Sequence, residues 1–210
     1  MKENINKILY DIFLALYQPF GFAVLLAVIG MYIPMYVNKI PMIDDGYFGA
    51  IKTWVAQFRK SSEFRKRFLF LFYVSLLLFR TLLNRNLWLN PISNIVGDWA
   101  LYSIDPNTGE CIFSTECVEN IILFLPFTFL LLWNKKKMSI EIKVMPTIVW
   151  TLRVSLVFSV SIEMLQLLLR LGTVQLSDVF FNVLGGCLGA LFYVFLNKII
   201  SIKGGKNSED

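Results

Sequence analysis

Polar side chains recur at helical spacing within one long apolar stretch of the chain. Ser159, Glu163, Gln166 and Arg170 follow one another at i, i+4, i+7 and i+11, which places them on one face of an α-helix. Ionisable groups are costly in lipid, about 2.5–3.5 kcal/mol each near a helix centre on insertion scales. These side chains must therefore face protein or water. Their carboxylate, amide and guanidinium groups can bind a ligand's hydroxyl, amide or phosphate groups, or they can hold helices together.

The next apolar stretch carries a matching polar stripe. Asp178 and Asn182 are one helical turn apart, and Gly185 and Gly189 continue on the same face. Two glycines at this spacing let another helix approach closely. Because only a short turn separates the two stretches, they are predicted to be antiparallel neighbours whose polar stripes face each other.

Two earlier apolar stretches add polar side chains at the same level. Arg80 and Asn84 are four residues apart at the end of one, and Glu119 and Asn120 open the next. The predicted binding residues are Arg80, Asn84, Asn120, Glu163, Gln166, Arg170, Asp178 and Asn182. We expect them to line a polar cavity that is open to the outer surface. The alternative is a fixed ion-pair network that holds the helices together without a ligand.

The composition indicates that these elements lie in a membrane. Of the 210 residues, 56% are hydrophobic and only 17% are charged, against about 25% charged in soluble domains, and the mean hydropathy is +0.61. The chain has no His, which excludes a Ser-His-Asp triad, a Cys-His dyad and a His-ligated metal. It has no P-loop motif either. We expect no cofactor, no metal ion and no nucleic-acid partner, despite a net charge of +5.

Apolar runs near the length of a membrane span predict an all-α, polytopic membrane bundle of about five transmembrane helices. The predicted spans are Ile12–Val37, Phe68–Leu83, Val118–Trp133, Val144–Leu169 and Ser177–Ile200. Pro19 and Pro34 predict kinks or frayed ends in the first span, and the second is short enough that it begins earlier or tilts. We divide the chain into residues 1–67 (first span and basic loop), 68–200 (membrane domain) and 201–210 (flexible tail).

The basic residues predict the orientation. Residues 38–67 hold seven Lys and Arg, whereas residues 84–117 hold only Arg85. Since Lys and Arg are in excess on the cytoplasmic side, we expect the N-terminus outside and the C-terminus in the cytoplasm. Lys2 and Lys7 favour the opposite side for the N-terminus, and an even number of spans would follow if the first stretch did not cross.

Two loops carry further signals. Ile51, Trp54, Val55 and Phe58 fall at i, i+3, i+4 and i+7 before a basic run, which is typical of a helix on the inner leaflet. The alternative is that these charges set topology and nothing more.

The outer loop has a strong turn signal at residues 105–109, and Trp88, Trp99 and Tyr102 suit an interfacial belt. Cys111 and Cys117 lie on the same side, either as a disulfide or as free thiols.

The polar motifs resemble those of the VanZ-like family. Its S-x-x-E-x-x-Q run, following Arg and D-x-x-x-N-x-x-G stretch are similar to Ser161-Ile-Glu163-Met-Leu-Gln166, Arg170 and Asp178-Val-Phe-Phe-Asn182-Val-Leu-Gly185. The first run departs from the family pattern by one residue, because Ser161 lies two residues before Glu163 instead of three. Its N-x-x-x-F-x-P-x-G element is similar to the run from Asn120 to Thr128, with Thr128 where the family usually has Gly, and its earlier Arg is similar to Arg80. The resemblance covers roughly residues 68–200. It implies a bacterial plasma-membrane protein linked to resistance to glycopeptide antibiotics, teicoplanin in particular, and it carries no catalytic residues over.

Three functions fit these observations. The first is a protein that binds an amphiphilic cell-envelope lipid or a lipoglycopeptide in the outward-facing cavity, with Arg80 and Arg170 on a phosphate or carboxylate. Its partners would be membrane lipids, lipid-linked cell-wall intermediates or a glycopeptide antibiotic. The second is an intramembrane enzyme acting on a lipid-linked cell-wall precursor, with Glu163 as general acid or base beside Asp178. The third is a secondary transporter or flippase, although no inverted repeat is visible in the sequence.

Overall fold

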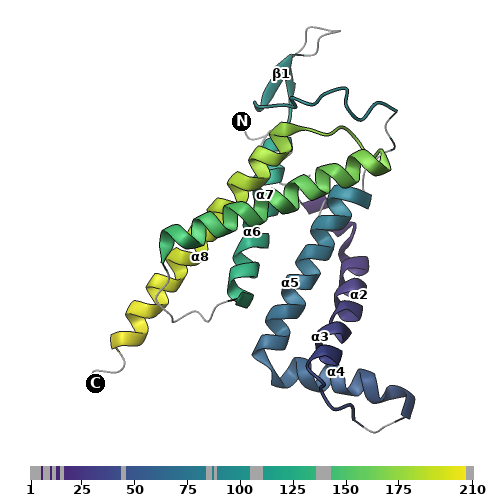
Figure 1. Cartoon of the computed structure of the whole chain (residues 1–210), viewed down its shortest axis with the longest axis vertical. Coiled ribbons are helices and arrows are strands. Elements are labelled where there is room, and N and C mark those ends of the chain that lie inside the picture. The colour runs from purple at the N-terminus through teal and green to yellow at the C-terminus, as the bar shows by residue number, and fades with distance from the viewer. Residues whose placement is uncertain are drawn as a thin grey trace.

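The computed structural model is a bundle of helices with a small hairpin at one end (Figure 1). It describes residues 6, 10, 13–14, 17–43, 46–83, 87, 89–104, 111–135 and 143–206, without the side chains of residues 47, 103–104, 111–113 and 203–206. The predicted all-α polytopic fold is confirmed.

The first predicted span is a broken helix. Helix α2 covers Phe20–Gly30 and α3 covers Tyr32–Val37, with Met31 between them. Pro34 has no N–H for the carbonyl of Gly30, four residues earlier, so the regular helical ladder is interrupted at this place. Pro19 immediately precedes α2. The interruption of the first span, predicted from its prolines, is therefore confirmed.

The predicted amphipathic segment is a helix, but half of its apolar residues face the protein. Helix α4 covers Gly49–Lys60, after a 3-10 turn at Gly46–Phe48. Trp54 stacks on Phe58, with ring centroids 5.2 Å apart, and both pack against Phe68 of the next helix.

The other two apolar residues of the segment, Ile51 and Val55, are exposed on α4. These two apolar side chains, together with the exposed Lys52, Arg59 and Lys60, can meet a lipid leaflet.

The second predicted span begins earlier than the apolar run does. Helix α5 covers Ser62–Leu78 and continues as one turn of π-helix, η2, at Phe79–Leu83. The Ser61 hydroxyl accepts a hydrogen bond from the N–H of Phe64 and so satisfies one of the free donors at the start of α5.

The remaining spans lie close to their predicted bounds. Helix α6 covers Glu116–Lys135, α7 covers Val144–Leu169 and α8 covers Leu176–Lys206. Between η2 and α6, strands β1 (Tyr102–Ile104) and β2 (Cys111–Phe113) form an antiparallel hairpin in which Tyr102 lies opposite Phe113. The turn predicted at residues 105–109 lies outside the described residues.

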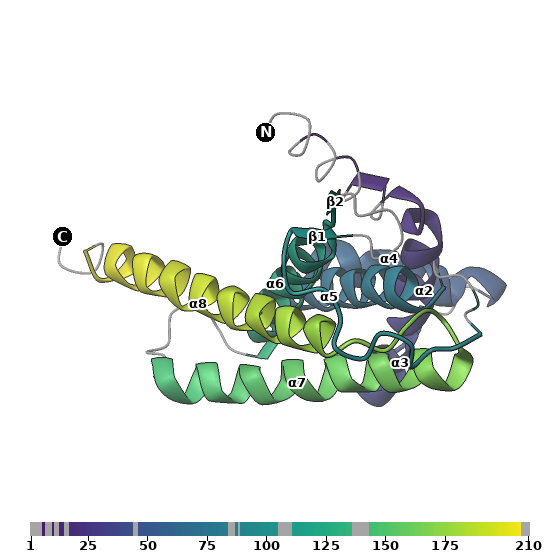
Figure 2. The same cartoon turned by 90° about the horizontal axis from the view of Figure 1, so that it is seen from above.

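Helix α8 packs against both α6 and α7, and α5 packs between α2 and α6. Figures 1 and 2 show α7 crossing the bundle beside α8. In Figure 1 the C-terminal ends of α5 and α7 and the start of α8 lie at the end of the bundle that carries the hairpin. The elements that carry the predicted polar residues therefore meet at one end.

Glycines permit the close approach of α8. A Cβ at Gly185 would overlap the carbonyl oxygen of Ile121, and one at Gly189 would overlap that of Leu125, both on α6. A Cβ at Gly186 would overlap the Ser155 hydroxyl on α7. The small-residue stripe predicted from the sequence therefore faces other helices, as in close-packed membrane helices.

The burial pattern of α7 is the reverse of a soluble helix. Its buried face carries Thr147, Thr151, Ser155 and Ser159, whereas apolar side chains such as Val157, at 67% exposure, point outward. This pattern fits lipid as the surrounding solvent, since apolar side chains meet acyl chains and polar ones meet each other.

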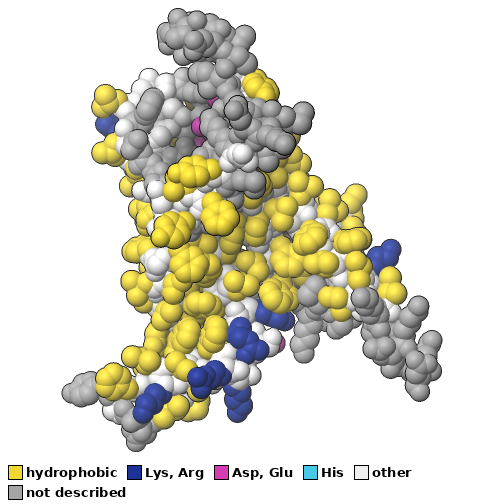
Figure 3. All heavy atoms as spheres, turned by 180° about the vertical axis from the view of Figure 1, so that it is seen from behind, with side chains coloured by type: hydrophobic (Ala, Val, Ile, Leu, Met, Phe, Trp, Pro, Cys, Tyr) yellow, Lys and Arg dark blue, Asp and Glu magenta, His cyan; other side chains and the backbone are white. Residues whose placement is uncertain are grey.

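Four helical segments are long and apolar enough to span a membrane: Phe20–Val37, Glu116–Lys135, Val144–Leu169 and Leu176–Ile202. The second predicted span, Phe68–Leu83, lies in the run of α5 and η2, which is not among these four. Hydrophobic side chains cover the middle of the face in Figure 3, and Lys and Arg gather toward its lower end. The chain is a multi-pass membrane protein.

Replacing Gly189 by Ala is expected to lower the thermal unfolding temperature in detergent. The added methyl group must displace the α6 backbone at Leu125, and overpacking costs about 1–3 kcal/mol. The matched control is Gly21→Ala in α2, where nothing lies within 4 Å of an added Cβ and where Ala favours the helix. Equal stability of the two variants would contradict the α6–α8 packing.

A candidate polar site at one end of the bundle

Helices α7 and α8 meet through an antiparallel ladder of polar and small residues. The Asn182 side-chain amide donates to the Ser159 hydroxyl at 2.9 Å, and Gly186 lies against Ser155 one turn further along. The same register brings Glu163 level with Asp178. The two polar stripes predicted from the sequence therefore face each other.

Helix α6 joins the ladder from the other side of α8. The Asn120 amide donates to the Asp178 carboxylate at 2.8 Å. Thr128, which stands where the family usually has Gly, is fully buried and donates to the carbonyl oxygen of Gly186 at 2.8 Å. This departure from the family motif therefore adds a hydrogen bond between α6 and α8.

The π-turn η2 links α5 to both α6 and α7. Gln166 donates from its side-chain amide to the carbonyl oxygen of Thr81 at 2.7 Å. Arg80 forms an ion pair with Glu119 of α6 at 2.8 Å, and Thr115 donates to the same carboxylate at 2.6 Å. A single π-turn often marks a functional segment, and here it presents a side chain to one helix and a carbonyl to another.

The segment between α7 and α8 supplies a backbone donor to the site. The N–H of Gln175 donates to the Glu163 carboxylate at 3.0 Å, and this hydrogen bond is buried. The Gln175 side chain also accepts from Ser177, at the start of α8. The carboxylate of Glu163 is thus held by the connection that positions Asp178.

The loop between η2 and α6 covers this connection. Leu87 pairs with Leu171 in an isolated β-bridge, and the N–H groups of Val174 and Leu176 donate to the carbonyls of Pro91 and Ile95 at 2.9 Å. These backbone hydrogen bonds fix the loop over the polar end of α7 and α8.

Gly97 allows the loop to approach closely. Its φ is +75°, in the left-handed region, and a Cβ there would overlap the Ser177 hydroxyl. Two residues later, the Trp99 ring packs on Phe180 and Phe181, with centroids 5.3 and 6.0 Å away. A larger residue at position 97 would lift the loop from α8.

Arg170 stands apart from the other predicted residues. It is exposed at the end of α7 with φ +54°. The N–H groups of Arg170 and Leu171 donate to the carbonyls of Leu167 and Gln166, which is the Schellman pattern of a helix end. Among the residues that the structure describes, no side chain pairs with Arg170.

The structure joins six of the eight predicted residues into the network, through Arg80, Asn120, Glu163, Gln166, Asp178 and Asn182. Arg170 lies at its edge, and Asn84 lies outside the described residues. The side chains of Glu163, Gln166, Asp178 and Asn182 are at most 5% exposed. The described residues thus form a closed, hydrogen-bonded layer, and the open cavity stays a prediction.

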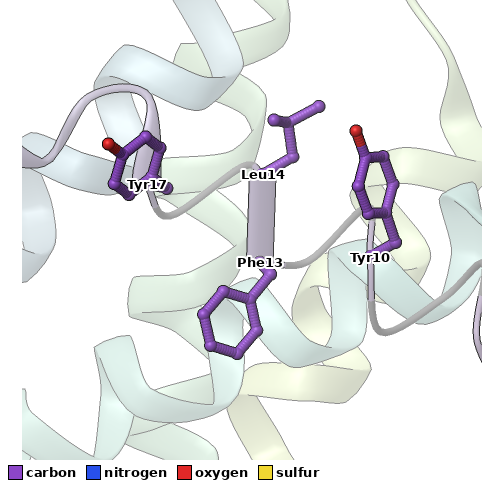
Figure 4. Close-up of a pocket in the computed structure, with 4 residues that line it drawn as sticks. All are labelled: Tyr10, Phe13, Leu14 and Tyr17. Carbon is purple, nitrogen blue, oxygen red and sulfur yellow. The ribbon is translucent and has the colours of Figure 1, made fainter.

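A pocket of about 380 Å³ lies elsewhere, on the N-terminal segment. It is lined by Tyr10, Phe13, Leu14 and Tyr17 (Figure 4), none of which is a predicted site residue. Its lining is almost wholly apolar, and it adds no group to the polar layer.

Sequence reasoning missed part of the network. Thr81 contributes a backbone carbonyl and Gln175 a backbone N–H, and no side-chain pattern encodes either. Cys117 is a buried free thiol, in agreement with the free-thiol alternative for that residue.

Comparison with known proteins identifies the family of this chain. The sequence matches the profile of the VanZ/LLP1 family over residues 47–197. The chain belongs to the VanZ/LLP1 family. It is 35% identical over 88 residues to "Protein VanZ" of Enterococcus faecium, a match that covers 42% of this chain and 50% of that protein. The match thus spans half the length of this VanZ relative. No solved structure matches the chain.

Replacing Asn120 by Leu is expected to destabilise the fold by about 1–3 kcal/mol, because it removes a half-buried hydrogen bond to the carboxylate of the buried Asp178. Thermal unfolding in detergent measures this loss. Asp178→Asn should cost less, since it leaves Asn120 an acceptor. Ser161→Ala is the control, because Ser161 is exposed and bonds only to its own helix at Val157. If Asn120→Leu and Ser161→Ala unfold at the same temperature, the hydrogen bond between Asn120 and Asp178 does not stabilise the bundle.

Proposed function

We propose that this VanZ/LLP1 protein binds the polar headgroup of an amphiphilic cell-envelope lipid, or of a lipoglycopeptide, at the outer end of its bundle in the bacterial plasma membrane. The observation that carries the proposal is the exposed guanidinium of Arg170 at the edge of a buried polar layer. A cation in this position attracts a phosphate or carboxylate.

The surroundings of Arg170 suit an amphiphile. The outward face of α7 next to it is apolar and exposed, with Leu168 at 74% and Leu169 at 53%. An acyl or polyprenyl chain can lie along this face while its headgroup contacts the guanidinium. The apolar chain of the ligand would thus lie on the apolar surface at the end of α7, and its headgroup would lie on the polar surface beside it.

The distribution of charge supports the orientation. Lys60, Lys66, Lys135 and Lys198 lie toward the ends of their helices that are remote from the polar layer, whereas Glu119, Glu163 and Asp178 lie in the layer. By the excess of Lys and Arg on the cytoplasmic side, the polar layer faces outward and the C-terminus is cytoplasmic. The start of α2 lies at the outer end, since Phe22 contacts Phe79, which supports an external N-terminus.

Arg170→Ala is expected to reduce the anionic lipid that co-purifies with the protein by about tenfold, the effect of losing one charge-assisted hydrogen bond. Quantitative mass spectrometry of the extracted lipid measures it. The matched control is Arg153→Ala, because Arg153 is an exposed arginine of the same helix in its other half. The proposal fails if Arg170→Ala retains as much lipid as the wild type, or if both variants lose it equally.

We further propose that headgroup binding contributes to glycopeptide resistance, as the family resemblance implies for teicoplanin. Expression in a susceptible Gram-positive host is expected to raise the inhibitory concentration of teicoplanin, and Arg170→Ala at equal membrane abundance is expected to abolish the rise. Arg153→Ala should preserve it. An unchanged inhibitory concentration on wild-type expression would contradict the link to resistance and leave lipid binding to be judged by the preceding experiment.

A further inference from the structure

One acceptor in the polar layer has no donor. Gln166 is 1% exposed, its amide nitrogen donates to the carbonyl of Thr81, and its oxygen Oε1 has no hydrogen-bond partner. A buried acceptor without a donor destabilises a protein, so each such group needs an explanation. The bond to Thr81 fixes the amide orientation, because a carbonyl accepts only from the nitrogen. Oε1 is therefore left without a donor.

Ser155 shows what an unpaired group looks like when packing explains it. Its hydroxyl is also buried without a partner, but it lies against Gly186, where even a Cβ would overlap it. No ligand atom fits between them. Gln166 instead lies in the polar layer, three residues after Glu163 and four before Arg170 on α7.

Arg170 occupies a backbone position that favours glycine. Its φ of +54° lies in the left-handed region, and glycine is the usual residue at this point of a Schellman motif. Gly172 stands two residues away with φ +83°, yet position 170 carries the longest cationic side chain. The backbone conformation thus opposes this residue type, and the guanidinium, which has no partner among the described residues, is what the side chain adds.

We propose that Gln166 Oε1 accepts a hydrogen bond from a hydroxyl or N–H group of the same headgroup whose phosphate lies on Arg170. This inference rests on the proposed function and narrows its ligand class. The two residues are four apart at the end of one helix, which corresponds to a rise of about 6 Å. The ligand is therefore an anionic phosphodiester that carries a hydroxyl or N–H donor on its distal headgroup, and a phosphodiester without such a donor binds less well.

Two lipids distinguish the effect of a hydrogen-bond donor in the headgroup from the effect of the phosphate charge. Phosphatidylglycerol and phosphatidylmethanol carry the same single negative charge on a phosphodiester, but only the first has headgroup hydroxyls. We expect the wild-type protein, in nanodiscs of phosphatidylcholine with a few per cent of either lipid, to retain phosphatidylglycerol about tenfold better. Native mass spectrometry of the lipid-bound protein measures the ratio. Equal retention of the two lipids by the wild type overturns the inference, and this comparison needs no variant.

Gln166→Leu is expected to lower the ratio to about one while phosphatidylmethanol binding stays unchanged, and Ser155→Ala is expected to keep the wild-type ratio. A Gln166→Leu protein that still prefers phosphatidylglycerol overturns the inference. If this variant does not fold, the wild-type ratio still decides.

Arg170→Gly separates this inference from the proposed function. Because glycine suits the backbone there, the unfolding temperature should stay the same or rise, while retention of both lipids falls about tenfold. Retention independent of Arg170 contradicts the proposed function. Retention that depends on Arg170 but does not discriminate the two lipids contradicts only the role of Gln166.

Discussion

The structure depends on one constraint: a polar group inside a bilayer must find its partner within the protein. Helix α7 exposes apolar side chains and buries a line of threonines and serines that ends in Glu163 and Gln166. No acyl chain can satisfy those groups, so α7 must lie against elements that offer donors and acceptors. Its contacts with α8 and η2 supply them for Ser159 and Gln166, whereas Thr151 donates to a carbonyl of α7 itself. The polar groups that join the helices at this end form the candidate site.

Close approach is the second requirement, and small residues meet it. Gly185 and Gly189 bring α8 to the backbone of α6, which places Asn120 within 2.8 Å of Asp178. Lipid offers no hydrophobic force to drive helices together, so packing and hydrogen bonds must do so. The π-helical turn η2 connects α5 to α7, because the carbonyl oxygen of Thr81 accepts a hydrogen bond from the Gln166 side chain.

The spans, their order and most members of the polar layer could be predicted from the sequence, because apolar length and helical spacing report directly on burial in lipid. The bounds of α7 agree with the predicted ones, and Asp178 and Asn182 meet partners on neighbouring helices. The pairings themselves could not be predicted. Arg80 binds Glu119, and Glu163 binds a backbone N–H of the α7–α8 connection, because partner choice depends on helix rotation and on loop conformation. Side-chain periodicity also assigned Trp54 and Phe58 to the lipid surface, whereas the turn between α4 and α5 folds them onto Phe68.

These relations connect stability with the proposed binding. The layer is closed where its groups satisfy each other, and it ends in a buried acceptor at Gln166 and an exposed cation at Arg170. Gln166 and Arg170 both lie within residues 47–197, which match the VanZ/LLP1 family. A headgroup bound there would supply the hydrogen-bond donor that Gln166 Oε1 lacks among the described residues.

Cysteine cross-linking in native membranes tests the meeting of the helices most directly. In a background with the three native cysteines replaced by Ala, the pairs Asn120→Cys with Asp178→Cys and Ser159→Cys with Asn182→Cys should each form an intramolecular disulfide on oxidation. Pairing Ser159→Cys with Asp178→Cys instead, one turn out of register, should give much less. Cross-linking of the offset pair in preference to the other two would contradict the common polar layer.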